Sequence, residues 1–399
     1  MGSPIEAEAM PLATPAAERV FTTVLTRGPL SRVELARTTG LSPAAVTKAV
    51  RPLLEAGYLL EAPSSQEHDA VGAGRPAIPL KVDARRASFV GIKATGDELI
   101  GVVTDLEAGI CTSRHLALAS REVSAVVAAI AELTEQLLAA SPESRAGVRA
   151  LGLAASGDID RELGLVRYSP FLVWHDVELR NLVERATGLR TVIENDVRAL
   201  TVAEHWFGAG VGARTFAVAT VGAGIGCGLV VNGSVVSGAH GVAGELGHVP
   251  VPFGERLCHC GARGCVEAIA ADGAIAAQVA EALGLSALPI AGARTLARQG
   301  SAKAQRVFAR AGRAIGLALA AMANLVGPER IVISGEGVAA YDLLADEMRA
   351  AFLEQAFGAA AQCELILRPL PFEEWARGAA AVAIHDLVTT DARARSWTP

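Results

Sequence analysis

The spacing of hydrophobic residues predicts three short helices near the start of the chain. The first covers about 17–26 and stops at a glycine followed by a proline. The second begins after Ser31, whose hydroxyl can accept from the first turn, and Glu34 completes a capping box. Gly40 ends this helix in a tight turn. Its apolar side is predicted to consist of Val33, Leu35 and Ala36.

A third helix is predicted to begin after Ser42, because a capping serine is followed by Pro43 at the first helical position. One buried stripe at i, i+4, i+7 and i+8 consists of Val46, Val50, Leu53 and Leu54. Pro52 removes a backbone hydrogen bond, so the helix is expected to kink or end near Arg51.

Two helices joined by a short glycine turn, the second with basic residues, are typical of a helix-turn-helix that places its second helix in the major groove. A wing is predicted after it, with strands at 57–60 and 76–82 around a polar turn at 63–74. The side chains expected to contact DNA are Ser42, Thr47, Lys48, Arg51 and, at the base of the wing, Arg75. The alternative is a small helical bundle used for dimerisation or domain docking.

After residue 82 the chain alternates strand-like runs with helices, which predicts an α/β fold with functional residues at strand ends. The predicted strands are 87–92, 99–103, 148–154, 189–193, 215–220, 228–231 and 330–334. The predicted helices are 124–139, 177–187 and a helical region at 301–325. So many segments require a second lobe.

Length and charge narrow the class of protein. A chain of 399 residues is long enough for two or three domains. No apolar run approaches the ~20 residues of a membrane helix and the start lacks a signal-peptide pattern, so a cytoplasmic protein with no membrane partner is expected. The net charge of −6 confines any DNA contact to a local basic surface, which the predicted helix-turn-helix supplies.

Three cysteines and a histidine lie close together in the second half of the chain, at His248, Cys258, Cys260 and Cys265. Three thiolates and an imidazole complete a tetrahedral zinc shell, and a shell filled by protein ligands is structural rather than catalytic. His259 competes with His248 as the fourth ligand. Reduced cysteines in a loop without metal are the alternative.

Two further motifs are weaker. The glycine-rich segment 222–228 lies between strands, where it can approach an anion or form an ordinary tight hairpin. Asn195 and Asp196 follow a predicted strand, where amide and carboxylate can grip hydroxyls or serve as a turn and helix cap.

In their order along the chain, these motifs resemble the ROK family, named for repressor, open reading frame and kinase. The motifs are Gly74-Arg75-Pro76, Glu194-Asn195-Asp196, the glycine-rich segment 222–228, Gly244-Glu245-Leu246-Gly247-His248, the cysteine run 258–267 and Ile333-Ser334-Gly335-Glu336-Gly337. The resemblance covers nearly the whole chain beyond Ala16 and implies an actin-like body of the sugar-kinase type, with two α/β lobes and a sugar in the cleft. The domains expected are a disordered N-terminus at 1–15, a winged helix-turn-helix at 16–82, a first lobe at 86–196 with the C-terminal helix 378–390, and a second lobe with the zinc site at 197–377.

The resemblance also assigns a ligand site. The residues that would hold sugar hydroxyls are Asn195, Asp196, Glu245, His248 and Glu267. In the kinases of the family, the residue at Asp196 is the base that takes the proton from the attacking hydroxyl. If zinc binds one ring nitrogen of His248, the other N–H is free for a sugar hydroxyl, so the metal would brace the sugar site.

The phosphate-binding loop of the kinases is degenerate in this chain. Lys93 stands where the kinases have an aspartate, and Asp97-Glu98 where they have a threonine and a lysine. Two carboxylates there would repel ATP, so we expect no kinase activity and no catalytic residue. Asp196 is then a vestigial base.

The sequence therefore predicts a sugar-responsive transcription repressor of sugar-metabolism genes that binds an inverted-repeat operator as a homodimer or dimer of dimers. Arg198 follows the Asn-Asp pair where a small or amide residue is usual, and Phe171 replaces an asparagine. Arg198 would select an anionic or amide-bearing sugar, or pair with a carboxylate. The alternatives are an active sugar kinase with a DNA-binding arm and a regulator controlled by a protein partner or by metal alone.

Overall fold

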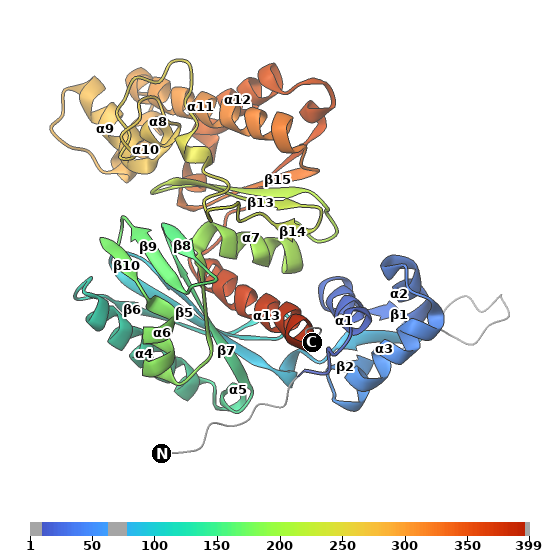
Figure 1. The fold of residues 1–399 in the computed structure, drawn as a ribbon. Helices are drawn as coiled ribbons and strands as arrows, with labels where there is room; N and C mark the ends of the chain where they lie inside the picture. The colour runs from blue at the N-terminus through green and yellow to red at the C-terminus, as the bar shows by residue number, and fades with distance from the viewer. Residues whose placement is uncertain (1–9, 63–77, 396–399) are drawn as a thin grey trace. The chain divides into compact units, whose positions relative to one another are not determined.

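A computed structural model describes residues 10–62 and 78–395, with side chains to residue 389 in the last helix. The chain divides into two compact units (Figure 1). Unit 1 comprises the residues up to Gly212 and those from Phe372 onward, and unit 2 comprises Ala213–Pro371.

The first part of unit 1 is a winged helix-turn-helix, as predicted. It contains α1 (Pro15–Arg27), α2 (Arg32–Thr39) and α3 (Pro43–Glu55), with strands β1 (Leu30–Ser31), β2 (Leu59–Glu61) and β3 (Pro79–Val82). Both predicted caps are confirmed, because Ser31 and Glu34 form a capping box at α2 and the Ser42 hydroxyl accepts from Ala45 N at α3. Strand β3 pairs antiparallel with both β1 and β2.

Two details of these helices differ from the prediction. Val33 is 75% exposed, because it lies on the opposite side of α2 from the buried Leu35. Helix α3 does not end near Arg51 but runs through Pro52 to Glu55. The proline ring costs one helical hydrogen bond, and burial of the next residue, Leu53, in the core holds the helix in place beyond it.

The edges of this module also differ from the prediction. Met10 and Leu12 are buried in its core, so packing begins within the segment 1–15 that the sequence predicts to be disordered. The polar turn of the wing and Arg75 lie outside the described residues.

The body of unit 1 is a five-stranded sheet in the order β11-β7-β4-β5-β6. Its strands are β4 (Ser88–Ala94), β5 (Glu98–Asp105), β6 (Ile110–Ala117), β7 (Val148–Ala155) and β11 (Thr191–Asn195), and a small second sheet contains β8 (Asp158–Asp160), β9 (Leu165–Ser169) and β10 (Trp174–Val177). Helices α4 (Val123–Ala140) and α6 (Leu179–Thr187) pack on one face, and α13 (Glu373–Arg395), with α7 (Asp196–Phe207) along it, packs on the other (Figure 1). A short helix, α5 (Pro142–Arg145), precedes β7. Because β4, β7 and β11 are parallel, their carboxyl ends meet at one edge of the sheet.

Helix α4 is long and apolar enough, by length and composition, to cross a membrane, with a mean hydropathy of 1.5 over 18 residues. Its buried side chains recur at helical spacing at Val126, Ile130, Leu133 and Leu137, and they pack on the sheet. This packing explains its hydrophobicity as that of a core helix.

Two glycines let α13 lie close to the sheet. A Cβ added at Gly91 on β4 or at Gly152 on β7 would overlap backbone atoms of α13, at Ala376 and Ala380 in the first case and at Ala379 in the second. Glycine at these positions is therefore required by a close approach of two backbones.

Gly152→Ala is expected to lower the free energy of unfolding by about 1–3 kcal/mol, because helix and strand must separate to admit the methyl group. Gly273→Ala is the matched control, since Gly273 lies in α9 (Asp272–Leu283) and an added Cβ has no neighbour within 4 Å. The control is expected to stabilise by about 0.5–1 kcal/mol. Urea unfolding of both variants measures these changes. If Gly152→Ala has the same free energy of unfolding as wild type, the close approach of α13 to β7 is contradicted.

Unit 2 is built on a five-stranded sheet in the order β14-β13-β12-β15-β16. Its strands are β12 (Phe216–Val221), β13 (Ile225–Val231), β14 (Ser234–Val235), β15 (Arg330–Ser334) and β16 (Glu364–Leu367), and its helices are α8 (Glu267–Ala270), α9, α10 (Ile290–Arg298), α11 (Ala302–Val326) and α12 (Tyr341–Gln355). Strands β12 and β13 pair from Val221 and Ile225 outward, so the glycine-rich segment forms a tight hairpin. The long segment between β14 and α8 carries the cysteine cluster.

The borders of the units differ from the lobe borders expected from the sequence. Helix α7 belongs to unit 1, because it packs along α13 over most of its length. The chain therefore changes unit at 212/213 and 371/372, where the sequence placed these changes at 196/197 and 377/378.

Candidate functional site

Four potential metal ligands converge in the segment between β14 and α8. The ligand atoms of His248, Cys258, Cys260 and Cys265 all lie within 4.8 Å of one another. Cys260 Sγ is 3.7 Å from Cys265 Sγ, and Cys258 Sγ is 3.6 Å from His248 Nδ1. A tetrahedral ion with metal–sulfur bonds of about 2.3 Å and metal–nitrogen bonds of about 2.0 Å places its ligand atoms roughly 3.5–3.8 Å apart. These two pairs of atoms have that spacing.

His259 belongs to a second possible set, with His248, Cys258 and Glu267. Its Nε2, however, lies 2.6 Å from Glu267 Oε1, and its side chain is 55% exposed. The geometry therefore favours His248 as the fourth ligand and gives His259 a contact with Glu267.

Two of the three thiols do not ionise readily by themselves. Burial raises the pKa of Cys258, and burial with hydrogen bonds among the thiols raises the pKa of Cys265 to about 12. A backbone hydrogen bond from Ala262 has the opposite effect and lowers the pKa of Cys260. Three thiolates at this spacing need a cation among them, which is what a metal supplies.

The predicted ligand residues of unit 2 lie near this cluster. Glu267 Oε2 accepts from Ile225 N at 2.9 Å, at the start of β13. Glu245 Oε2 is 3.9 Å from His248 Nε2, the ring nitrogen that is not paired with Cys258. The structure thus places Glu245, His248 and Glu267 around the cysteine cluster, with the side chain of Glu245 56% exposed and that of Glu267 17% exposed.

Asp196, in unit 1, is buried and ion-paired. Its carboxylate accepts from Lys93 Nζ and, at 2.6 Å, from Ser156 Oγ. Lys93 is 6% exposed and Asp196 is 7% exposed. The Lys93 ammonium also donates to Ser156 and lies 5.5 Å from the centre of the Trp375 ring. Lys93, Ser156 and Asp196 meet because each stands at the carboxyl end of one of the parallel strands β4, β7 and β11.

This environment keeps Asp196 ionised. Burial by itself raises the pKa of the Asp196 carboxyl, but the charge of Lys93 and the hydrogen bonds from Lys93 and Ser156 outweigh burial and lower that pKa. A general base works best with a pKa near the working pH and with its oxygens directed at the proton to be removed. The carboxylate of Asp196 is instead directed at Lys93 and Ser156.

The two carboxylates of the degenerate phosphate loop each face a cationic or basic group. Asp97 Oδ1 lies 2.9 Å from an Arg121 amino group, and Glu98 Oε2 lies 3.0 Å from His115 Nδ1. Burial lowers the pKa of His115, but hydrogen bonds to Glu98 and Glu373 raise it overall. Each carboxylate therefore has a partner within the protein, and the expected repulsion of ATP stays a prediction.

Asn195 is the N-cap of α7. Its Oδ1 accepts from the backbone N–H groups of Val197 and Arg198, and its Nδ2 donates to Gly157 O at 3.0 Å. Arg198 Nε lies 2.7 Å from Glu194 Oε1 in a buried ion pair. Of the roles considered for Arg198, the structure shows the pairing with a carboxylate.

Sequence reasoning missed the partners of Lys93, which are Ser156, Asp196 and Trp375. The signal was present, because Lys93 interrupts a run of apolar residues in a strand that is buried throughout. A buried ammonium needs a carboxylate partner.

Three of the residues predicted to contact DNA lie on the exposed side of α3. Thr47, Lys48 and Arg51 are exposed, whereas the other side of the helix is buried. The Ser42 hydroxyl caps the helix and accepts from Ala45 N at 3.2 Å. A shallow groove on this side is lined by Pro43, Ala44, Thr47, Lys48, Arg51, Pro52 and Glu55.

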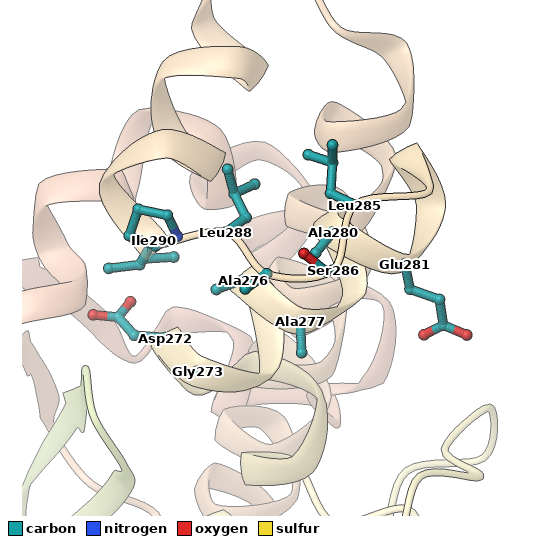
Figure 2. Close-up of a pocket in the computed structure, with 12 residues that line it drawn as sticks. Asp272, Gly273, Ala276, Ala277, Ala280, Glu281, Leu285, Ser286, Leu288 and Ile290 are labelled. Carbon is teal, nitrogen blue, oxygen red and sulfur yellow. The ribbon is translucent and has the colours of Figure 1, made fainter.

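Another hollow, of about 680 Å³, lies beside α9 in unit 2 (Figure 2). Its wall is mainly alanine and leucine, and the carboxylate of Asp272 at its edge is bound by Arg294. None of the predicted ligand residues lines it. A sugar needs several converging polar groups, so this hollow is a weaker candidate than the residues around the cysteine cluster.

Comparisons with known proteins match both the winged helix-turn-helix and the rest of the chain. The ROK family profile matches residues 89–386, and a winged helix-turn-helix DNA-binding profile matches residues 23–59. The DNA-binding transcriptional dual regulator NagC of Escherichia coli is 30% identical over 318 residues, 77% of each chain. The xylose repressor of Bacillus subtilis is 26% identical over 329 residues, 82% of this chain and 83% of the repressor.

Solved structures give the same result. A ROK family transcriptional regulator described as a homologue of the Escherichia coli Mlc protein superposes with a TM-score of 0.79 at 26% identity, over 94% of this chain and 98% of that one. A ROK family glucokinase from Streptomyces griseus, with glucose and AMPPNP, superposes with a TM-score of 0.65 at 25% identity, over 74% of this chain and 99% of the kinase. The profile covers most of the chain, and NagC is 30% identical over 77% of both chains, so this protein belongs to the ROK family.

Proposed function

We propose that this protein is a DNA-binding transcription regulator, a repressor of sugar-metabolism genes, whose operator affinity responds to a sugar. The observation that carries the proposal is the joining, in one chain, of a winged helix-turn-helix to a ROK body. Relatives that match this chain over most of their length are named as regulators and repressors. We also propose that the protein is cytoplasmic, because bacterial transcription takes place in the cytoplasm. Cysteine thiols stay reduced in that compartment, which fits the three clustered cysteines.

The DNA surface consists of Ser42, Thr47, Lys48 and Arg51 of α3 together with Arg75 of the wing. We propose that α3 enters the major groove and that two copies of the chain bind an inverted repeat, as a homodimer or dimer of dimers. The exposure of Thr47, Lys48 and Arg51 on one side of α3 supports this role.

Lys48→Ala is expected to weaken operator binding by about 1–3 kcal/mol if Lys48 reads a base edge, and to weaken all DNA equally if it contacts phosphate. Fluorescence anisotropy with the operator and with a random duplex separates the two cases. Lys303→Ala, in α11 of unit 2, is the control and should leave both affinities unchanged. If Lys48→Ala binds the operator as tightly as wild type does, Lys48 does not contact DNA.

The sugar contacts proposed are Asn195 and Asp196 of unit 1 and Glu245, His248 and Glu267 of unit 2. Asn195, Asp196 and Glu267 make internal hydrogen bonds. The side chains of Glu245 and His248 are 56% and 29% exposed, so we assign most of the affinity to these two residues. Glu245 is the more exposed of the two and offers a carboxylate that can accept from two neighbouring hydroxyls.

A structural zinc ion is the proposed metal, held by His248, Cys258, Cys260 and Cys265. Thiolates and imidazole are the ligands zinc prefers, and the ligand spacing supports a tetrahedral ion. Zinc on His248 Nδ1 would fix the Nε2–H tautomer, so the ring could donate to a ligand while the metal holds its orientation.

The protein is proposed to lack kinase activity. Asp196, at the position of the kinase base, is paired with Lys93, and its lowered pKa makes it a poor proton acceptor. In unit 2, Glu267 accepts from the glycine-rich turn and the Glu336 carboxylate lies against Gly222. Carboxylates at that turn oppose the binding of an anionic phosphate chain.

The experiment that tests the function measures operator affinity across a panel of monosaccharides and sugar phosphates, with wild type and Glu245→Gln. At least one sugar should change the wild-type affinity by about 5–150-fold, and Glu245→Gln should reduce that response. If no sugar changes the affinity, control by a protein partner or by metal becomes the better account. ATP turnover with any hexose would instead support the alternative that the protein is a sugar kinase. A ROK glucokinase is among the similar structures, which is why this alternative is tested.

A further inference from the structure

One acidic side chain lies among the basic ones on the exposed side of α3. Arg51 Nε donates to Glu55 Oε1 at 2.7 Å, and these side chains are 80% and 61% exposed. Both residues line the same groove as Thr47 and Lys48. A carboxylate on a DNA-facing surface repels the phosphates of DNA and so weakens binding. A carboxylate beside Arg51 therefore needs an explanation other than a contribution to DNA affinity.

The contact with Glu55 uses only part of the arginine. A guanidinium is planar and has five N–H donors in fixed directions. Glu55 occupies the Nε position, which leaves the edge formed by the two terminal amino groups for a second partner. In the major groove guanine presents two adjacent acceptors, O6 and N7, and these match a two-donor edge.

The competing partner for Arg51 is the DNA backbone. A long arginine side chain that is not held can turn to a phosphate, and such a contact contributes affinity without sequence information. Glu55 restricts this choice in two ways. Its hydrogen bond holds the guanidinium on the groove side of α3, and its negative charge repels a phosphate that approaches the same place.

We propose that Glu55 is a specificity-determining residue of the recognition helix, and this inference rests on the proposed DNA-binding function. Glu55 holds Arg51 so that its terminal amino groups read one guanine in each half-site. It lowers the affinity for DNA in general and raises the preference for the operator.

The test uses the full chain and three kinds of duplex. The first carries the sequence that wild-type protein selects from a random library, the second has each guanine of a half-site changed in turn to adenine, and the third is a random duplex. Wild type should discriminate against adenine at one guanine by about 5–150-fold. Glu55→Gln should lose most of that discrimination and bind the random duplex several-fold more tightly, and Arg51→Ala should lose discrimination at the same guanine.

A matched control comes from a second Arg–Glu pair in the same module. Arg32 and Glu61 lie 3.0 Å apart between α2 and β2, so Glu61→Gln removes a similar carboxylate without altering α3. It should keep the wild-type discrimination. Thermal unfolding of Glu55→Gln should match wild type, because an exposed pair of this kind contributes little stability.

Two results would overturn the proposal. One is that Glu55→Gln discriminates between guanine and adenine as strongly as wild type does. The other is a uniform loss of affinity in Arg51→Ala with a weaker salt dependence, which would make Arg51 a phosphate contact. Failure of the proposed DNA-binding function would give a result distinct from both of these, because wild-type protein would then select no sequence from the library.

Discussion

Asp196→Asn should lower the free energy of unfolding by about 3–5 kcal/mol at pH 7. The change keeps the size of the side chain and an acceptor for Ser156, but it leaves the Lys93 ammonium buried without a counter-charge. Removal of one partner from a buried ion pair has costs of this order. Urea unfolding followed by circular dichroism measures the difference.

A double substitution separates the unpaired charge from other effects. Lys93→Met with Asp196→Asn removes both charges and should regain most of the lost stability, since a buried pair replaced as a whole is often nearly neutral. Equal destabilisation of the single and double variants would assign the loss to hydrogen bonds or packing.

The stability that the Asp196 carboxylate contributes depends on pH in a definite direction. The folded pKa of Asp196 is lowered from its ordinary value of 3.8, so its contribution is fully present above that value and is lost as the pH falls through the folded pKa. The stability gap between wild type and Asp196→Asn should therefore narrow only in strong acid. A gap that closes near neutral pH would contradict an ion pair with an acidic Asp196.

Cys260→Ser should lower zinc affinity by more than about 100-fold and abolish the sugar response. Substitutions outside the ligand shell already cost about 10–100-fold, and Cys260 is a proposed ligand. Loss of the metal would loosen the segment that carries Glu267, which follows Cys265 by two residues. Metal content per chain, in protein purified without chelator, measures the effect.

The two histidines provide the matched comparison. His248→Ala should lose zinc, whereas His259→Ala should retain it, because His259 Nε2 contacts Glu267. Cys363→Ser, in a half-buried position outside the cluster, controls for the loss of a thiol. Wild-type protein without stoichiometric zinc, or zinc loss only in His259→Ala, would refute the proposed shell.

Features that depend on neighbouring residues could be predicted from the sequence. The capping box of Ser31 and Glu34 needs only a spacing of three residues, and the structure has it. The four proposed metal ligands also lie within one short segment, so their convergence required only turns between them. Seven strands and three helices of the body followed from the apolar pattern for the same reason, whereas others, such as β6 and α9, were not predicted.

Features that depend on strand order could not be predicted this way. Lys93 and Asp196 are 103 residues apart, and they meet because β4 and β11 both lie parallel to β7, one on each side of it, in a mixed sheet. The sequence showed a lysine where the kinases have an aspartate, but not the carboxylate it binds. The partners of Asp97 and Glu98 escaped for the same reason, since Arg121 and His115 come from other segments.

The division of unit 1 between two stretches of chain also affects how the protein is made. A ribosome completes residues 213–371 before it reaches α13, so Gly91 and Gly152 on the sheet have no helix over them during that interval. At about 5–20 residues per second the interval lasts on the order of ten seconds. Unit 2 is contiguous and can fold on the nascent chain, whereas the apolar face of unit 1 that receives α13 stays uncovered until α13 has been synthesised.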